Sequence, residues 1–250
     1  MEKISATIIT YNEEKNIERC LKSLQGVADE IIVVDSFSTD KTKEICLKYG
    51  VAFFEREFVD YSDQKNFSID QARYGLILSI DADEELSEEL KKSIIEVKNN
   101  PEHDGYYCNR MTSYCGKWIK HSGWYPNHQL RLWKKSKGRW SGTIHEKLTI
   151  SKKTCAHIKG DLLHYSYENF SQHLLKIDKF TDFQALEMFN KRKKANLYTI
   201  IFKPFLRFLR HYFFSLGFLD GYEGFIISIQ SAYGHFLKYI KLRKLNKNAY

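Results

Sequence analysis

Two aspartates that follow an apolar run are the residues of this sequence best suited to metal chemistry. Asp81 and Asp83 come directly after residues 76–80, a run that reads as a strand buried on both faces. In an extended segment, residues two apart point the same way, so their carboxylates would converge. Converging carboxylates repel each other unless a cation binds them, and hard oxygen ligands suit Mg²⁺ or Mn²⁺. The alternative for residues 81–85 is a solvated helix N-terminus, because acids favour the first turn.

The chain around these aspartates alternates strand-like and helix-like stretches. Apolar, β-branched runs occur at residues 4–10, 30–35 and 51–54, and helical stretches separate them at 13–24 and 39–49. A βαβαβ order requires a parallel sheet with right-handed crossovers. We therefore predict an α/β fold of Rossmann-like type, with a mostly parallel sheet flanked by helices.

Polar side chains follow these strands at the edge where open α/β sheets bind ligands. They are Thr10, Tyr11, Asn12 and Glu13 after the first strand, Asp35 after the second, and Asp81 and Asp83 after the fourth. A nucleotide is the expected occupant, because a base and ribose need a few placed acceptors and a diphosphate needs donors and a cation. No glycine-rich dinucleotide or Walker sequence follows the first strand. Asn12 is also the expected N-cap of the first helix.

Three segments in order carry a family resemblance. Residues 7–14, 31–42 and 78–85 resemble the family 2 glycosyltransferases of the GT-A fold. The resemblance implies a nucleotide-sugar donor, with a UDP-sugar favoured, and a Mg²⁺ or Mn²⁺ cofactor at the Asp-x-Asp motif. The chain departs from the family at one place, since many members carry Asp and Gly where it has Ser36 and Phe37.

The resemblance also implies roles for single residues. Asp83 would ligate the metal that bridges the diphosphate, Asp81 would bind the ribose or reach the metal through water, and Asp35 would contact the base. The polar residues at 10–13 would line the donor site. Asn66 belongs to a segment that resembles the loop and helix approaching the donor, and surface polarity at a helix start is the other interpretation of this segment.

From residue 104 the sequence becomes rich in aromatic residues and short strand-like pieces. We therefore divide a catalytic domain, residues 1–165, into a donor half at 1–103 and an acceptor half at 104–165, where aromatic faces can stack on sugars. The run Gln-Leu-Arg-Leu-Trp at 129–133 is similar to a motif of processive members. It precedes the expected catalytic base instead of following it, so we assign it no role.

That expected base is Glu146, in the run Gly-Thr-Ile-His-Glu that follows the aromatic strands. The resemblance favours Glu146 as the group that takes the proton of the acceptor hydroxyl in an inverting, single displacement, with His145 as an orienting neighbour. A His-Glu pair also occurs in many strands without catalytic role. His164 resembles a late histidine that completes the metal shell in GT-A enzymes, and an imidazole suits Mn²⁺.

The charge of the chain is concentrated at its C-terminal end. The formal net charge is +8, yet residues 191–250 contain twelve Lys and Arg against two acids, Asp220 and Glu223. A nearly neutral body with a basic, aromatic tail implies an anionic partner, either a lipid surface or nucleic acid. Five scattered cysteines without metal-ligand spacing indicate reduced thiols in the cytoplasm.

Two amphipathic helices are expected in this tail, within a helical region at residues 166–250. In the first, at 197–219, Lys203, Arg207 and Arg210 recur at helical spacing and would be costly in hydrocarbon. An interfacial helix avoids that cost and gains from anionic lipid. We expect a peripheral protein on the cytoplasmic face of the inner membrane, with no nucleic-acid or protein partner; helices packed as ordinary core are the alternative.

The predicted function is that of an inverting, metal-dependent glycosyltransferase acting on a saccharide or glycolipid acceptor. Residues 218–221, Phe-Leu-Asp-Gly, resemble a subfamily that adds a glucose-type sugar to the lipopolysaccharide core. One alternative is a nucleotidyltransferase that makes a nucleotide-sugar, although the turn after the first strand is acidic. The other alternative is a basic protein that binds nucleic acid or lipid. The tail places its aromatic residues on one face of an amphipathic helix, which favours lipid over nucleic acid.

Overall fold

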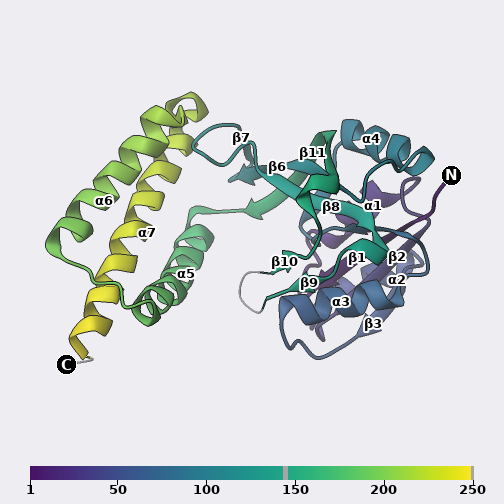
Figure 1. Cartoon of the computed structure of the whole chain (residues 1–250), viewed down its shortest axis with the longest axis horizontal. Coiled ribbons are helices and arrows are strands. Elements are labelled where there is room, and N and C mark those ends of the chain that lie inside the picture. The colour runs from purple at the N-terminus through teal and green to yellow at the C-terminus, as the bar shows by residue number, and fades with distance from the viewer. Residues whose placement is uncertain (143–145, 249–250) are drawn as a thin grey trace. The chain divides into compact units, whose positions relative to one another are not determined.

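The computed structural model describes residues 1–142 and 146–248 of the chain (Figure 1). The chain divides into two compact units. Unit 1 comprises residues 1–110 and 127–165, and unit 2 comprises residues 111–126 and 166–250. The segment 111–126, which the sequence groups with the acceptor half, thus packs with the C-terminal helices.

Unit 1 is built on a mixed sheet whose first half is parallel. The parallel strands lie in the order β3 (Ala52–Glu55), β2 (Glu30–Asp35), β1 (Ile4–Thr10) and β4 (Leu76–Ser79). Antiparallel pairing then adds β8 (His128–Lys134), β6 (Gly105–Tyr114), β11 (Cys155–Tyr167) and β5 (Glu84–Leu86). A separate ribbon pairs β9 (Trp140–Ser141) with β10 (Lys147–Leu148). Strands β1, β2 and β3 pair in parallel as predicted, and the α/β class is confirmed.

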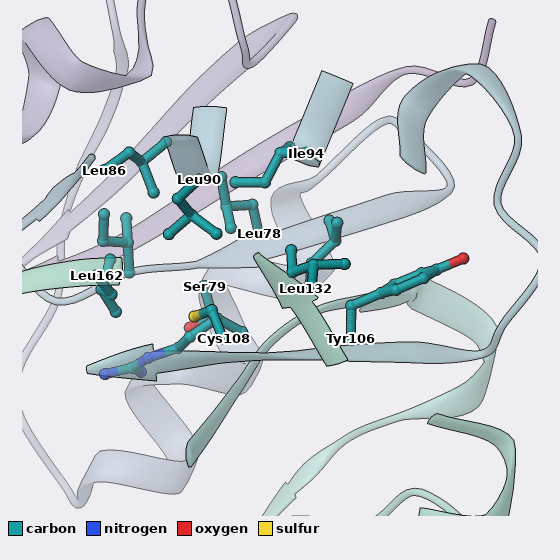
Figure 2. A pocket seen from close by; sticks show the side chains of 12 residues that line it. Leu78, Ser79, Leu86, Leu90, Ile94, Tyr106, Cys108, Leu132 and Leu162 are labelled. Carbon is teal, nitrogen blue, oxygen red and sulfur yellow. The ribbon is translucent and has the colours of Figure 1, made fainter. Parts of the chain in front are cut away.

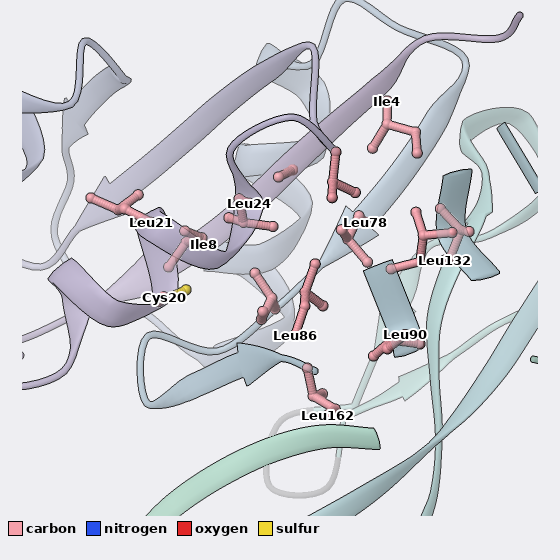
Figure 3. Packing of buried hydrophobic residues seen from close by; sticks show 14 of the residues in the cluster. Ile4, Ile8, Cys20, Leu21, Leu24, Leu78, Leu86, Leu90, Leu132 and Leu162 are labelled. Atoms are coloured by element: carbon pink, nitrogen blue, oxygen red, sulfur yellow. The ribbon is translucent and has the colours of Figure 1, made fainter. Parts of the chain in front are cut away.

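Helices cover both faces of this sheet. Side chains of α1 (Ile17–Leu24), α2 (Thr42–Lys48) and α4 (Glu88–Asn99) join the larger hydrophobic core, and α3 (Tyr61–Gln71) packs on the opposite face. Figure 3 shows the larger core, in which leucines from α1, α4, β4 and β11 interdigitate. Short 3₁₀ turns occur at Lys135–Lys137 (η1) and Lys152–Thr154 (η2).

The first helix begins later than predicted. It starts at Ile17, after Asn16, and Asn12 has a left-handed backbone with φ of 55°. Asn12 does not cap this helix, because its side-chain oxygen instead accepts a hydrogen bond from Thr39 N at 2.8 Å. Asn tolerates the left-handed region better than most residues do.

The core of unit 1 leaves no room for a ligand between β4 and α4. A cavity of about 10 Å³ lies there among leucines and isoleucines, together with Tyr106 and Cys108 (Figure 2). That volume is about the minimum for one water molecule. A substrate must therefore bind outside the core.

Unit 2 contains three long helices. They are α5 (Phe170–Asn190), α6 (Leu197–Leu209) and α7 (Gly221–Asn248), and α7 packs against both α5 and α6 (Figure 1). A π-helical turn, η3 (Arg210–Phe214), and a 3₁₀ turn, η4 (Gly217–Asp220), connect α6 to α7. The predicted helix over 197–219 is thus interrupted, and Leu216 takes a left-handed backbone with φ of 53°.

A buried aspartate fixes the short hairpin of β6 and β7 (Lys117–Ile119) onto these helices. The carboxylate of Asp220 accepts hydrogen bonds from Lys120 N at 3.2 Å, His121 N at 3.0 Å and Ser122 Oγ at 3.1 Å. These bonds explain why unit 2 includes residues 111–126. Among the helices in the described part of the chain, none is long and apolar enough to cross a membrane.

Candidate functional site

The carboxyl ends of the parallel strands meet at one edge of unit 1. The register pairs Thr10 at the end of β1 with Asp35 at the end of β2, and Thr7 with Ser79 at the end of β4. Asp81 therefore lies just past the same edge. The edge that the sequence predicts as the ligand site is the one where these polar residues gather.

The loops after β1 and β2 are tied to each other. Asp35 is buried and accepts hydrogen bonds from the Ser38 backbone N at 2.7 Å and from its hydroxyl at 2.5 Å. The Ser38 hydroxyl in turn accepts from Asn12 N at 2.8 Å. Asp35 and Asn12 thus order the two loops, whatever further contact they make with a base. Tyr11, by contrast, is exposed.

Two more residues of the first loop differ in their hydrogen bonding. Glu13 N donates to Thr42 Oγ1 at 2.8 Å, and its carboxylate accepts from Asn16 Nδ2 at 2.9 Å. Thr10 is buried, and its hydroxyl has no hydrogen-bond partner among residues 1–142 and 146–248. A buried hydroxyl without a hydrogen-bond partner is costly. A bound ligand could supply the missing partner of Thr10.

Asp81 lies in a network of buried charges. Its carboxylate contacts Arg131 Nη2 at 2.6 Å and Lys65 Nζ at 3.3 Å. The same Arg131 nitrogen lies 2.6 Å from Glu84, a carboxylate that also accepts from Asp81 N at 2.9 Å. Arg110 lies 3.6 Å from Glu84. One guanidinium group therefore serves two carboxylates.

These contacts shift the pKa values of Asp81 and Glu84 in opposite directions. Burial alone would raise the pKa of Asp81, but Arg131 and Lys65 hold it well below its usual range. Burial raises the pKa of Glu84, and the neighbouring Asp81 charge adds to that rise against the opposing effect of Arg131. Asp81 is thus the more acidic of the two carboxyl groups.

Asp83 and Asp81 contact different partners. The backbone turns after Asp81, since Glu84 N donates to Asp81 O at 3.0 Å. Asp83 Oδ2 lies 3.2 Å from His164 Nε2, because β5 and β11 pair with His164 opposite Glu84. The two aspartates therefore have different side-chain partners, Arg131 and Lys65 for Asp81 and His164 for Asp83.

Asp83 and His164 offer one oxygen and one nitrogen ligand at close range. Within residues 1–142 and 146–248 no group of three or more His, Cys, Asp or Glu side chains is placed to hold a metal ion. Mg²⁺ usually keeps several waters and is bound through one or two carboxylates plus substrate phosphates, and imidazole suits Mn²⁺. The two residues therefore fit a metal whose shell is completed by diphosphate and water.

Glu146 is connected to the same network through Lys65. Its Oε1 atom lies 3.2 Å from Lys65 Nζ, and that ammonium also lies 4.7 Å above the ring of Trp140. Asn66 bonds to the Trp140 backbone with both ends of its amide, at 2.9 Å each. Both polar ends of Asn66 are thus engaged with β9. His145, the expected neighbour of the base, lies outside the described residues.

The structure brings together Asp81, Glu146, Lys65, Arg131 and Glu84 in one set of ionic contacts. Of these residues, Asp81 and Glu146 are candidates from the sequence alone, and Lys65 adjoins the candidate Asn66. The sequence gives Arg131 no role, and for Glu84 it offers only the alternative of a solvated helix N-terminus at residues 81–85; both side chains are buried. The signal for Arg131 was its position inside an apolar strand, since a charged residue there needs a partner.

Comparisons with known proteins agree on one family. The family model described as "Glycosyl transferase family 2" matches residues 5–201. A glycosyltransferase of Rickettsia bellii (strain RML369-C), described as uncharacterized, is 32% identical over 98% of this chain and 87% of its own length. The lipopolysaccharide core biosynthesis glycosyltransferase LpsC of Rhizobium meliloti (strain 1021) is 30% identical over 96% of this chain and 91% of its own.

A solved structure extends the similarity. The crystal structure of S. aureus TarS 1-349 in complex with UDP-GlcNAc is similar over 99% of this chain and 92% of that chain, with a TM-score of 0.47 and 14% identity. The relatives of similar length define the class of this protein as glycosyltransferase. The chain belongs to glycosyltransferase family 2. The expected family and the likeness to a lipopolysaccharide core enzyme are confirmed.

Proposed function

We propose that this protein is an inverting, metal-dependent hexosyltransferase. It moves a sugar from a nucleotide-sugar, with a UDP-sugar favoured, to a saccharide acceptor of the lipopolysaccharide core or another cell-envelope glycan. The observation that carries the proposal is the 3.2 Å approach of Asp83 Oδ2 to His164 Nε2 beside the ends of the parallel strands. The likeness to LpsC supports the choice of acceptor.

In this proposal the donor lies across the strand ends. Asp83 and His164 hold a Mn²⁺ or Mg²⁺ ion, which when bound neutralises the charge of the departing diphosphate. Asp81 accepts a hydrogen bond from a ribose hydroxyl. The lowered pKa of its carboxyl group beside Arg131 supports that role. The unpartnered hydroxyl of Thr10 supplies a further polar contact.

Glu146 is the proposed general base. Its carboxylate takes the proton of the acceptor hydroxyl while the hydroxyl oxygen bonds to the anomeric carbon. The bond from that carbon to the diphosphate oxygen breaks on the opposite side, so the configuration inverts. Lys65 supports this assignment, because one ammonium holds Glu146 at 3.2 Å and Asp81 at 3.3 Å, and so keeps the base beside the donor residues.

The donor site is tested by calorimetric titration of the whole protein with UDP, with Mn²⁺ or with a chelator. We expect Mn²⁺-dependent binding, and we expect Asp83→Ala and His164→Ala each to weaken it at least tenfold. Glu96→Ala is the matched control, since Glu96 is an exposed acid on α4 away from the strand ends. Binding that is equally tight with chelator and in Asp83→Ala would refute the metal site.

The chemistry is tested with UDP-sugars and a lipopolysaccharide core acceptor. Wild-type protein should release UDP and give a product of inverted anomeric configuration. Glu146→Gln should bind UDP normally while its turnover falls about 10²- to 10⁴-fold, the usual contribution of a general base. Release of pyrophosphate would instead establish a nucleotidyltransferase, and full turnover in Glu146→Gln would exclude this residue as the base.

We also propose that unit 2 docks peripherally on the anionic cytoplasmic face of the inner membrane. Helix α6 exposes six large apolar side chains: Leu197, Tyr198, Ile201, Phe202, Phe205 and Leu206. Exposed apolar surface of this kind marks interaction sites, and a bilayer interface would bury it. The basic excess of residues 191–250 favours anionic lipid as the partner.

Vesicle flotation tests this docking. The protein should float with vesicles that contain phosphatidylglycerol more than with neutral ones, and the double change Phe202→Ser with Phe205→Ser should abolish flotation. Leu175→Ser, at an exposed apolar position on α5, is the control. Equal flotation of the double variant, or salt-sensitive binding to RNA or DNA without lipid binding, would refute the proposal.

A further inference from the structure

Unit 2 contains a cavity of its own. It has a volume of about 330 Å³ and lies among α5, α6 and α7. Each helix contributes a cation to its wall, namely Lys176, Arg207 and Lys238, and the rings of Trp124 and Tyr167 also line it. The volume is at the lower end of the range for small-molecule sites. All of these residues belong to unit 2, so the cavity has no lining residue from unit 1.

Among the described residues that line this cavity, the cations have only uncharged partners, such as Ser166 O at 3.3 Å from Lys176 Nζ. No Asp or Glu is among the described residues that line the cavity. The two acids of α5 that lie nearest in sequence, Asp178 and Asp182, are both bound by Lys241 at 2.8 Å. Arg207 donates to a neutral partner, Ser231 Oγ, at 2.9 Å.

Burial makes the positive charge of this wall more costly. Burial lowers the pKa of Lys238, and the charges of Arg207 and Lys203 lower it further. Burial likewise lowers the pKa of Arg207. A solvated basic face would not show this effect, because water would screen its charges. The arrangement is therefore costly for the free protein and would be relieved by an anion.

Polar atoms without partners surround the same space. Gln230 and His173 line the cavity at 2% and 7% exposure, and Gln230 Nε2 and His173 Nδ1 have no hydrogen-bond partner among the described residues. The other end of the Gln230 amide is fixed, since its oxygen accepts from Tyr114 OH at 2.9 Å. Its NH₂ group is therefore left as a donor. His173 and Gln230 also interact with each other. Since an amide NH₂ has two donor hydrogens, the remaining N–H of Gln230 is the donor that an acceptor in the cavity would satisfy.

We propose that this cavity binds a phosphate group carried by a saccharide. Lys176, Arg207 and Lys238 would contact the phosphate oxygens, Gln230 would donate a further hydrogen bond, and the ring of Trp124 would lie beside the sugar. Phosphate offers several acceptor oxygens to converging cations, and aromatic faces suit sugar rings. This binding goes beyond the proposed transfer reaction and does not depend on the donor site.

Calorimetric titration of the whole protein in phosphate-free buffer tests the proposal with glucose 6-phosphate, glucose and inorganic phosphate as separate ligands. Glucose 6-phosphate should bind at least tenfold more tightly than either of the others. Saturating UDP should leave this binding unchanged, and so should Asp83→Ala, which separates it from the donor site. Displacement by UDP, or equal affinity for inorganic phosphate, would overturn the proposal.

Two substitutions distinguish ligand binding from a structural role. Lys238→Met should weaken glucose 6-phosphate binding at least tenfold without lowering the melting temperature of the free protein, because Lys238 is half-buried beside the like charges of Arg207 and Lys203. Lys176→Gln, at an exposed position of the wall, should weaken binding without a change in folding. Lys179→Met on α5, outside the wall, is the control. Unchanged binding in Lys238→Met and Lys176→Gln would overturn the proposal.

Discussion

Replacement of Arg131 by methionine tests whether the buried charge network holds the strand ends together. The guanidinium lies 2.6 Å from both Asp81 and Glu84, and it is 4% exposed. Removal of one partner of a buried ion pair typically costs about 3–5 kcal/mol, because the other charge is left uncompensated. We therefore expect Arg131→Met to lower the free energy of unfolding by about this amount.

The two carboxylates should contribute unequally to that loss. The Asp81 side chain is 31% exposed and keeps Lys65 at 3.3 Å, so water and an ammonium would still stabilise it. The Glu84 side chain is 0% exposed and would keep the hydrogen bond from Asp81 N at 2.9 Å and, as a cation, Arg110 at 3.6 Å. Most of the cost should therefore come from Glu84, and Glu84→Gln should recover part of it in the Arg131→Met background.

Urea unfolding followed by circular dichroism measures both effects. The coupling between Arg131→Met and Glu84→Gln should be about 0.5–3 kcal/mol, the range for residues in one network. The pair Arg131→Met with Asp81→Asn is the matched comparison and should recover less. A loss below about 1 kcal/mol in Arg131→Met, or equal recovery by both second changes, would refute the reasoning.

Three further predictions concern single residues. Burial lowers the pKa of His173 from 6.5 to about 4, so this residue should lower the free energy of unfolding by up to about 3 kcal/mol as pH drops through this window. His173→Phe should remove that share of the slope, while the share of His235, whose pKa burial lowers likewise, remains. Gly224→Ala should lower the melting temperature, because its Cβ would lie 1.9 Å from Gly217 O. Asn66→Ala should cost about 1–3 kcal/mol by urea unfolding, since two Trp140 backbone groups lose partners; UDP titration then tests its donor role.

The predictable part of the fold follows from local pattern. Runs of β-branched residues and the turns between them place β1 to β4, and the edge rule places Thr10, Asp35 and Asp81 together. These inferences need only neighbours in sequence and one general rule of sheet topology. They therefore locate the edge where the strands end without knowledge of any long-range contact.

The network around Arg131 could not be predicted in this way. Its position depends on the antiparallel register of β4 and β8, which pairs Leu78 with Leu132. No periodicity encodes that register, since it joins segments about fifty residues apart. The same limit explains unit 2, where Tyr114 bonds to Gln230 over 116 residues of sequence. The ion pairs that organise this site are properties of the tertiary structure.

The inserted segment of unit 2 has a consequence for exchange of parts between relatives. Arg110 N donates to Asn127 O at 2.7 Å, so the two ends of segment 111–126 already touch within unit 1. Its Lys117 pairs with Glu223 at 3.0 Å, so the segment belongs with the C-terminal helices. In a chimaera joined only after residue 165, segment 111–126 would come from one protein and the C-terminal helices that it contacts would come from the other. If residues 111–126 and 166–250 are exchanged together, the contact between Lys117 and Glu223 is kept. Where segment 111–126 is removed, a short turn can join residue 110 to residue 127.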